Sequence, residues 1–241
     1  MISEEFIKQL AVKWQTSDIN IIREYVQHQF LSFFYKQKET EKFFFKGGTA
    51  LRIVYQSPRF SEDLDFSTLV FSNQVIEKLI EEALAQLAYL NIKMEIKEAK
   101  ETSGGYFFDS KIKIFSKEVG IKLNFVFKKE AFGEPKIINS LFLPPYSLVV
   151  LKEEDLVGEK ITALLSRKKL RDYFDLYFIL RSSLDKTTIR KSLKEILALV
   201  KNTNLDFNQL KLFLPKSFWI ILKDFKKNLL KEVERLGSLK I

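Results

Sequence analysis

The sequence predicts an α+β protein, in which a mixed β-sheet with helices is followed by a C-terminal helical bundle. Apolar and polar residues alternate, in whole or in part, at 92–96, 106–115 and 121–127, which is the period of strands with one buried face. After Pro144 and Pro145, apolar residues instead recur every three or four positions, which is typical of amphipathic helices. Strands gathered in the first part of a chain and helices in the second favour the α+β class.

The other elements follow from the same periods and from turn residues. Two helices are expected at 3–14 and 17–35, a strand at Phe43–Phe45 and a covering helix at 72–90. Turns are expected at 104–105 and 118–120, and a linker at 135–147. We therefore expect a first part of residues 1–147 and a bundle of residues 148–241. The bundle helices are expected at about 152–170, 171–180, 187–200, 207–213 and 217–236.

Composition excludes several kinds of site. The 241 residues include no cysteine and one histidine, His28, so disulfides, thiolate zinc sites and paired catalytic imidazoles are excluded. His28 is expected to be a surface or packing residue. A formal charge of +9 favours a polyanionic partner, with nucleic acid preferred. The chain begins without an apolar signal-peptide core and has no apolar run of about 20 residues, so we expect a cytoplasmic protein with no membrane segment.

A glycine turn and a pair of aspartates predict the chemistry. Gly47 and Gly48 interrupt a strand-like apolar run just before helix-forming residues, which indicates a tight turn of the size of a phosphate group. On the next strand, Asp63 and Asp65 are expected to point to one face, with their Cα atoms about 6.5 to 7 Å apart. At that spacing two carboxylates can share divalent cations, so the arrangement is that of a nucleotidyltransferase site. Taken alone, the glycine pair could be an ordinary turn, and the two aspartates could lie on a solvated strand face.

This stretch resembles the AbiEii/AbiGii toxin family of the nucleotidyltransferase superfamily. The family signature is a GGTAL-like turn followed by R-x-S-x-D-hydrophobic-D-F. The chain matches it at Gly47, Gly48, Thr49, Ala50 and Leu51, and then at Arg59, Ser61, Asp63, Leu64, Asp65 and Phe66. The resemblance implies that Asp63 and Asp65 bind the metal. It also assigns Gly47, Gly48, Thr49, Arg59 and Ser61 to nucleotide binding.

A second constellation lies about 95 residues further on. On a continuous helix Arg167 and Arg171 would each fall within about 20° of Lys160, one on either side, which could simply be a solvated cationic face. The run also resembles the K-x-x-A-x-x-x-R-x-x-x-R-D-x-x-D motif of the same family, matched at Lys160, Ala163, Arg167, Arg171, Asp172 and Asp175. Lys160 and one of the two arginines would neutralise the β- and γ-phosphates or the transition state, and both Arg167 and Arg171 are assigned to nucleotide binding. Asp172 or Asp175 would either hold an arginine or act as the base, and the sequence leaves both roles open.

The resemblance implies a magnesium-dependent or manganese-dependent toxin of a type IV toxin-antitoxin or phage-defence system. It would transfer nucleotides from a nucleoside triphosphate to RNA, as relatives do at the tRNA 3′ end, and would have a cognate antitoxin. The chain departs from many nucleotidyltransferases at Asn124, which stands where a third carboxylate is expected and could give an oxygen ligand but no charge.

Two other functions stay open. The neutral Asn124 and the positive charge are compatible with a nucleic-acid or partner-binding module without turnover, and transfer to a protein hydroxyl is a further alternative. The lysines of the bundle could follow nucleic-acid phosphates or form an ordinary soluble surface. The nucleotidyltransferase function requires a cleft in which Lys160 faces Asp63 and Asp65 across about 6 to 10 Å. The bundle would then complete that cleft.

Overall fold

The computed structural model describes residues 2–238, which form two compact units. The sheet unit consists of Met1–Gln56 and Phe60–Leu151, and the helical unit consists of Ser57–Arg59 and Lys152–Ile241. The division after Leu151 falls four residues beyond the boundary expected at residue 147. Ser57–Arg59 belongs to the helical unit although it lies between two elements of the sheet unit.

The sheet unit contains a seven-stranded sheet in the order β3-β4-β5-β2-β1-β7-β6. Its strands are β1 (Phe43–Lys46), β2 (Asp63–Thr68), β3 (Met94–Thr102), β4 (Gly105–Ile114), β5 (Lys117–Phe127), β6 (Gly133–Ile138) and β7 (Tyr146–Leu151). Its helices are α1 (Glu4–Lys13), α2 (Asp18–Phe34), η1 (Thr40–Lys42), α3 (Gly47–Ile53) and α4 (Asn73–Tyr89). Strand β2 pairs antiparallel with β1 and parallel with β5, so the predicted mixed sheet is confirmed.

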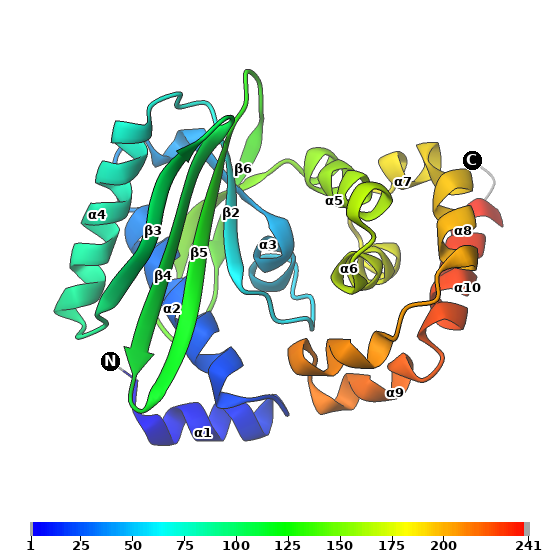
Figure 1. Ribbon diagram of the computed structural model, residues 1–241, viewed down its shortest axis with the longest axis horizontal. Coiled ribbons are helices and arrows are strands. Elements are labelled where there is room, and N and C mark those ends of the chain that lie inside the picture. The colour runs from blue at the N-terminus through cyan, green and yellow to red at the C-terminus, as the bar shows by residue number, and fades with distance from the viewer. Residues whose placement is uncertain (1, 239–241) are drawn as a thin grey trace. The chain divides into compact units, whose positions relative to one another are not determined.

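Helices α2 and α4 cover one face of the sheet (Figure 1). Aromatic side chains fill the space between them and the central strands, because Phe66 and Phe125 stack at 4.8 Å and Phe34 of α2 packs against both. The caps follow the sequence, since the Ser3, Ser17 and Ser72 hydroxyls accept hydrogen bonds from the first turns of α1, α2 and α4.

Two sequence expectations for this unit are wrong. The expected linker at 135–147 contains most of β6 and the start of β7. Pro135 fits there because β6 is an edge strand, where a missing N–H costs no ladder hydrogen bond on the open side. The expected turn at 118–120 lies inside β5, and the chain instead reverses at Phe115, whose φ of 54° is left-handed.

The helical unit carries the rest of the chain. Its elements are α5 (Glu153–Arg167), α6 (Leu170–Arg181), α7 (Thr187–Lys191), α8 (Leu193–Asn202), η2 (Phe207–Phe213), η3 (Lys216–Phe218), α9 (Trp219–Leu222) and α10 (Phe225–Ser238). The helix expected at 187–200 is divided at Ser192, and the one expected at 217–236 is divided after Leu222. Within residues 2–238, no helix combines the length and the apolar character that crossing a membrane requires.

The junction between α5 and α6 shows that the expected alignment of Lys160, Arg167 and Arg171 on one continuous helix is wrong. Helix α5 ends because Lys168 adopts a left-handed conformation with φ of 53°, and α6 starts two residues later. Arg171 therefore lies on a different helix from Lys160 and Arg167. The three cations do not form one stripe on a continuous helix.

Candidate active site

The turn between β1 and α3 brings the backbone against a carboxylate. Gly47 has φ of +82°, which a residue with a side chain rarely adopts. A Cβ added at Gly47 would also collide with the Asp65 carboxylate. Glycine at this position thus satisfies both the turn and the close approach of Asp65.

Asp63 and Asp65 share the face of β2 that lies opposite the aromatic core. Both are half-buried, whereas Leu64 and Phe66 between and after them are fully buried. The alternation predicted from the sequence is confirmed. Thr49 is buried, and its hydroxyl donates to the backbone carbonyl of Asp63, so it joins α3 to β2.

Asp65 lies between a lysine and an amide across the sheet. In the strand register, Lys46 of β1 is opposite Asp65 on one side and Asn124 of β5 on the other, so these side chains leave the sheet on one face. Asn124 Nδ2 donates to Asp65 Oδ1 at 2.9 Å. Only the amide nitrogen can make this bond to a carboxylate, so Asn124 faces Asp65 as a hydrogen-bond donor.

Asp63 has cationic neighbours as well. Lys122 of β5 is its partner in register and lies 4.0 Å from Asp109 Oδ2. Arg23 of α2 pairs with Glu62 at 3.0 Å. Burial lowers the pKa of Arg23, while the charges of Glu62 and Asp63 oppose that effect. Sequence reasoning missed Arg23 and also Lys46, because strand register and helix packing place them near the aspartates.

The donor set fits magnesium or manganese held partly by substrate. Within residues 2–238, no group of three or more His, Cys, Asp or Glu side chains is arranged to hold a metal ion. Mg²⁺ needs only one or two protein carboxylates when phosphates and water complete its coordination. Asp63 and Asp65, half-buried on one face, meet that requirement.

Hydrogen bonds to the backbone hold the residues that directly precede β2. Gln27 Nε2 donates to the backbone carbonyls of Ser61 and Glu62 at 3.0 and 3.1 Å. Ser61 is therefore fixed through its main chain. His28, beside Gln27, is buried and its Nδ1 lies 2.9 Å from the Tyr146 hydroxyl. Burial, with a smaller effect of Arg52, lowers the pKa of His28 to about 3, which fits a packing residue.

The helical unit contains a buried ion cluster around Asp175. Arg59 donates from Nε to Asp175 Oδ1 at 2.8 Å and from Nη2 to Oδ2 at 3.0 Å. Lys160 Nζ donates to Asp175 Oδ2 at 2.9 Å. Asp175 is 1% exposed, and burial acts to raise its pKa, but the charges of Arg59 and Lys160 outweigh burial and lower it. Asp175 is therefore an ionised anchor whose oxygens are both engaged.

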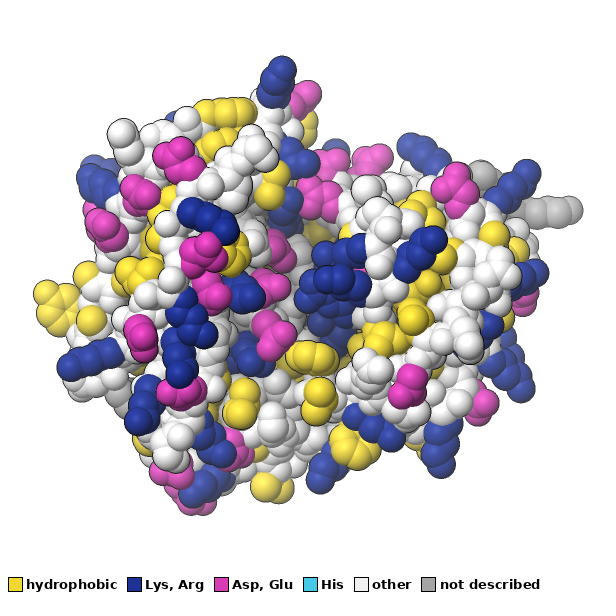
Figure 2. Space-filling model, viewed as in Figure 1, with side chains coloured by type: hydrophobic (Ala, Val, Ile, Leu, Met, Phe, Trp, Pro, Cys, Tyr) yellow, Lys and Arg dark blue, Asp and Glu magenta, His cyan; other side chains and the backbone are white. Residues whose placement is uncertain are grey.

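Asp172 is engaged just as fully. Arg167 binds its two oxygens at 2.9 and 2.7 Å, and the backbone N–H of Lys169 donates to it at 3.2 Å. Asp172 thus caps the start of α6 and holds Arg167 across the α5–α6 junction. Of the two roles left open by the sequence, holding an arginine is the one that these contacts favour for Asp172 and Asp175. Figure 2 shows Lys and Arg side chains gathered over α5 and α6.

The structure therefore makes two groupings of the predicted residues. Gly47, Asp65 and Asn124 meet in the sheet unit, where Asp63 shares a face of β2 with Asp65, and Arg59, Lys160 and Asp175 meet in the helical unit. The cleft expected between Lys160 and the aspartate pair stays a prediction.

Similarity to known proteins agrees with this geometry. The model of the nucleotidyl transferase AbiEii toxins, from type IV toxin-antitoxin systems, matches residues 29–235. The chain belongs to the AbiEii family. Two crystal structures from Helicobacter pylori resemble this AbiEii protein. JHP933 is 20% identical with a TM-score of 0.53, covering 93% of this chain and 99% of its own. A candidate nucleotidyltransferase is 19% identical with a TM-score of 0.52, covering 91% and 98%.

These likenesses confirm the fold and the family predicted from the two sequence motifs. At this identity the two crystal structures establish a shared nucleotidyltransferase-like fold over nearly the whole length of both chains. None of the curated proteins is measurably similar to this AbiEii family member.

Proposed function

We propose that this AbiEii protein transfers nucleotides from a nucleoside triphosphate to an RNA acceptor such as the tRNA 3′ end, in the cytoplasm. The observation that carries the proposal is the pair Asp63 and Asp65 on one face of β2, with Gly47 packed against Asp65. Two half-buried carboxylates beside a turn without side chains can accept a metal-bound phosphate, which a bulkier turn would exclude.

The residues of the sheet unit have distinct roles in this proposal. Asp63 and Asp65 hold Mg²⁺ or Mn²⁺, which when bound supplies positive charge at the reacting phosphate. Gly47 and Gly48 let the backbone approach the nucleotide. Asn124 orients Asp65 through its amide hydrogen bond. Thr49 and Ser61 act by fixing β2 in place.

The helical unit supplies cations. Arg59 donates to both oxygens of Asp175, and Lys160 donates to one of them as well. Lys160 can therefore leave Asp175 for a phosphate while the buried carboxylate keeps its ion pair with Arg59. Arg167, with a side chain 40% exposed, and Arg171 give further positive charge for the leaving phosphates.

The test is transfer of labelled nucleotide to purified tRNA with magnesium, using each of the four nucleoside triphosphates. Asp63→Asn and Asp65→Asn should each reduce labelling by at least about 100-fold, because each removes a charge that holds the metal. Glu101→Gln, at an exposed position of edge strand β3, is the matched control and should label normally. Equal labelling by the wild type and both aspartate variants would reject the proposal.

A binding module without turnover is the second candidate function. It is favoured by Asn124, which provides a hydrogen bond in place of a third carboxylate. Calorimetry with nucleoside triphosphate and magnesium separates the two, since transfer requires triphosphate affinity that depends on metal. Incubating labelled nucleotide with cell lysate would reveal transfer to a protein hydroxyl instead of RNA.

The toxin-antitoxin family also suggests an antitoxin as a functional partner. Co-expression with the product of a neighbouring gene should relieve the growth arrest that the toxin causes. Growth arrest by Asp65→Asn as strong as by the wild type would separate toxicity from transfer.

A further inference from the structure

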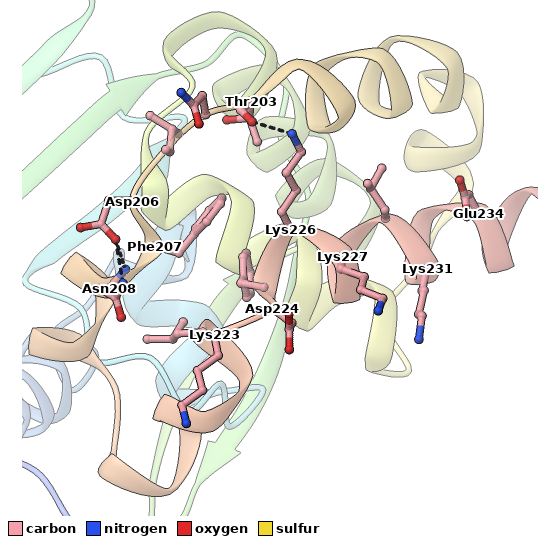
Figure 3. A pocket seen from close by; sticks show the side chains of 15 residues that line it. Thr203, Asp206, Phe207, Asn208, Lys223, Asp224, Lys226, Lys227, Lys231 and Glu234 are labelled. Atoms are coloured by element: carbon pink, nitrogen blue, oxygen red, sulfur yellow. Dashed lines mark hydrogen bonds between the residues drawn. The ribbon is translucent and has the colours of Figure 1, made fainter.

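A cavity of about 630 Å³ lies in the helical unit, and none of the residues assigned to transfer lines it. One wall is the segment from Thr203 to Asn208, and the other is formed by the end of α9 and by α10 (Figure 3). Four lysines line it, at positions 223, 226, 227 and 231. Three carboxylates, Asp206, Asp224 and Glu234, also line it.

Only part of this charge is used within the fold. Lys226 donates to the Thr203 carbonyl at 2.8 Å, and Asp206 accepts from the backbone and side chain of Asn208. In the described part of the chain, by contrast, Lys223, Lys227 and Lys231 form no side-chain hydrogen bond or ion pair. Lys227 and Lys231 project to the same side of α10, one helical turn apart (Figure 3).

Helix stability does not account for the lysines at the start of α10. Lys226 and Lys227 lie in the first turn of α10, and Lys223 lies just before it. The N-terminal end of a helix carries partial positive charge, so cations there are unfavourable, and the carboxylate at this end is Asp224, directly before a first turn without acidic residues. An anion bound at the lysines would remove this conflict.

The mixture of charges distinguishes between anionic partners. The anionic groups of an acidic peptide are carboxylates, which Asp224 and Glu234 would repel, and its regularly spaced donors are backbone N–H groups that its own structure can use. An RNA backbone offers phosphates to the lysines and ribose 2′-hydroxyl donors to the carboxylates. The two aromatic rings in the wall, Phe207 and Phe225, are buried, so they give no platform for stacking bases.

We propose that this cavity binds the sugar-phosphate backbone of RNA, without reading its sequence. The proposal rests on the proposed function in one respect, because it takes the acceptor to be RNA. Lys223, Lys227 and Lys231 contact phosphates, and Asp224 and Glu234 accept from ribose hydroxyls. The cavity thereby adds affinity for the acceptor RNA.

The experiment measures RNA affinity of the full chain by fluorescence anisotropy, without nucleotide or metal. The probes are bulk tRNA, a short single-stranded RNA and the DNA of the same sequence. The variant Lys223→Gln/Lys227→Gln/Lys231→Gln is compared with Lys191→Gln/Lys194→Gln/Lys201→Gln, which removes three exposed lysines elsewhere in the same unit. Circular dichroism confirms that both are folded.

The cavity variant should lose at least about tenfold in RNA affinity, and its slope of log affinity against log salt should fall by about 2, since each single-strand phosphate contact contributes about 0.7. The control should keep the wild-type slope, and the wild type should prefer RNA to DNA. Equal losses in both variants, unchanged binding in the cavity variant, or equal affinity for RNA and DNA would each overturn the proposal. A wild type that binds RNA in this way but transfers no nucleotide would overturn the proposed function alone.

Discussion

Asp63 and Asp65 of β2 differ from Asp172 and Asp175 of α6 in what surrounds their oxygens. The first pair is half-buried on an open sheet face, where Asn124 donates one hydrogen bond to Asp65. The second pair is buried, and arginine forks occupy both oxygens of each carboxylate. The same residue type therefore suits metal binding in one unit and structural anchoring in the other, because exposure and prior hydrogen bonding decide which ligands a carboxylate can still accept.

The largest effect expected from this difference is on stability. Asp175→Asn should lower the free energy of unfolding by about 3 to 5 kcal/mol, because it leaves Arg59 and Lys160 with an uncompensated buried charge. Urea unfolding at neutral pH measures this. Asp155→Asn, an exposed position on α5, should change it by under about 1 kcal/mol.

This stabilisation also has a defined pH window. The folded pKa of Asp175 lies below the ordinary value of 3.8, so its contribution is complete above that pH and is lost as the pH falls further. The stability gap between the wild type and Asp175→Asn should narrow below about pH 4. A gap that stayed constant would show that Asp175 is not ionised in the folded protein.

Lys160→Ala separates anchoring from transfer. Arg59 still engages both Asp175 oxygens, so the variant should stay folded, with transfer reduced by about 100-fold or more. Lys152→Ala, at an exposed position just before α5, is the control for the transfer assay. Full activity of folded Lys160→Ala would mean that other cations neutralise the leaving phosphates.

Gly47→Ala tests the close approach of the turn to Asp65. A left-handed conformation costs alanine about 1 to 2 kcal/mol, and the methyl group must also displace the Asp65 carboxylate. We expect lower thermal stability together with weaker magnesium-dependent nucleotide binding by calorimetry. Gly104→Ala, where an added Cβ meets nothing within 4 Å, should change neither.

Asn124→Asp has the smallest expected effect on affinity and stability. It tests whether a third carboxylate beside Asp65 strengthens metal binding. A third charge beside Asp65 should raise Mn²⁺ affinity by about tenfold, since affinity rises with the number of charged ligands. Without metal the like charges should cost under about 1 kcal/mol. Asn124→Ala adds no charge and serves as the control in calorimetry, where a similar gain in affinity would contradict this explanation.

The sequence alone determined the local features of this protein. The strand periodicity of β2 placed Asp63 and Asp65 on one face, serine caps began α1, α2 and α4, and the two motifs identified the family. These depend on residues close together in the chain, whose geometry is fixed by the backbone.

Only the tertiary structure decided which side chains share partners. Asn124 and Lys46 meet Asp65 through strand register, and Arg59 reaches Asp175 across 116 positions of sequence. Strand β6 was missed because Pro135 suggested a linker, whereas an edge position tolerates proline, and β7 was missed because it begins directly after the Pro144-Pro145 pair. The break at Lys168 moved Arg171 to a second helix, and at this junction the buried Asp172 binds Arg167 and the Lys169 N–H.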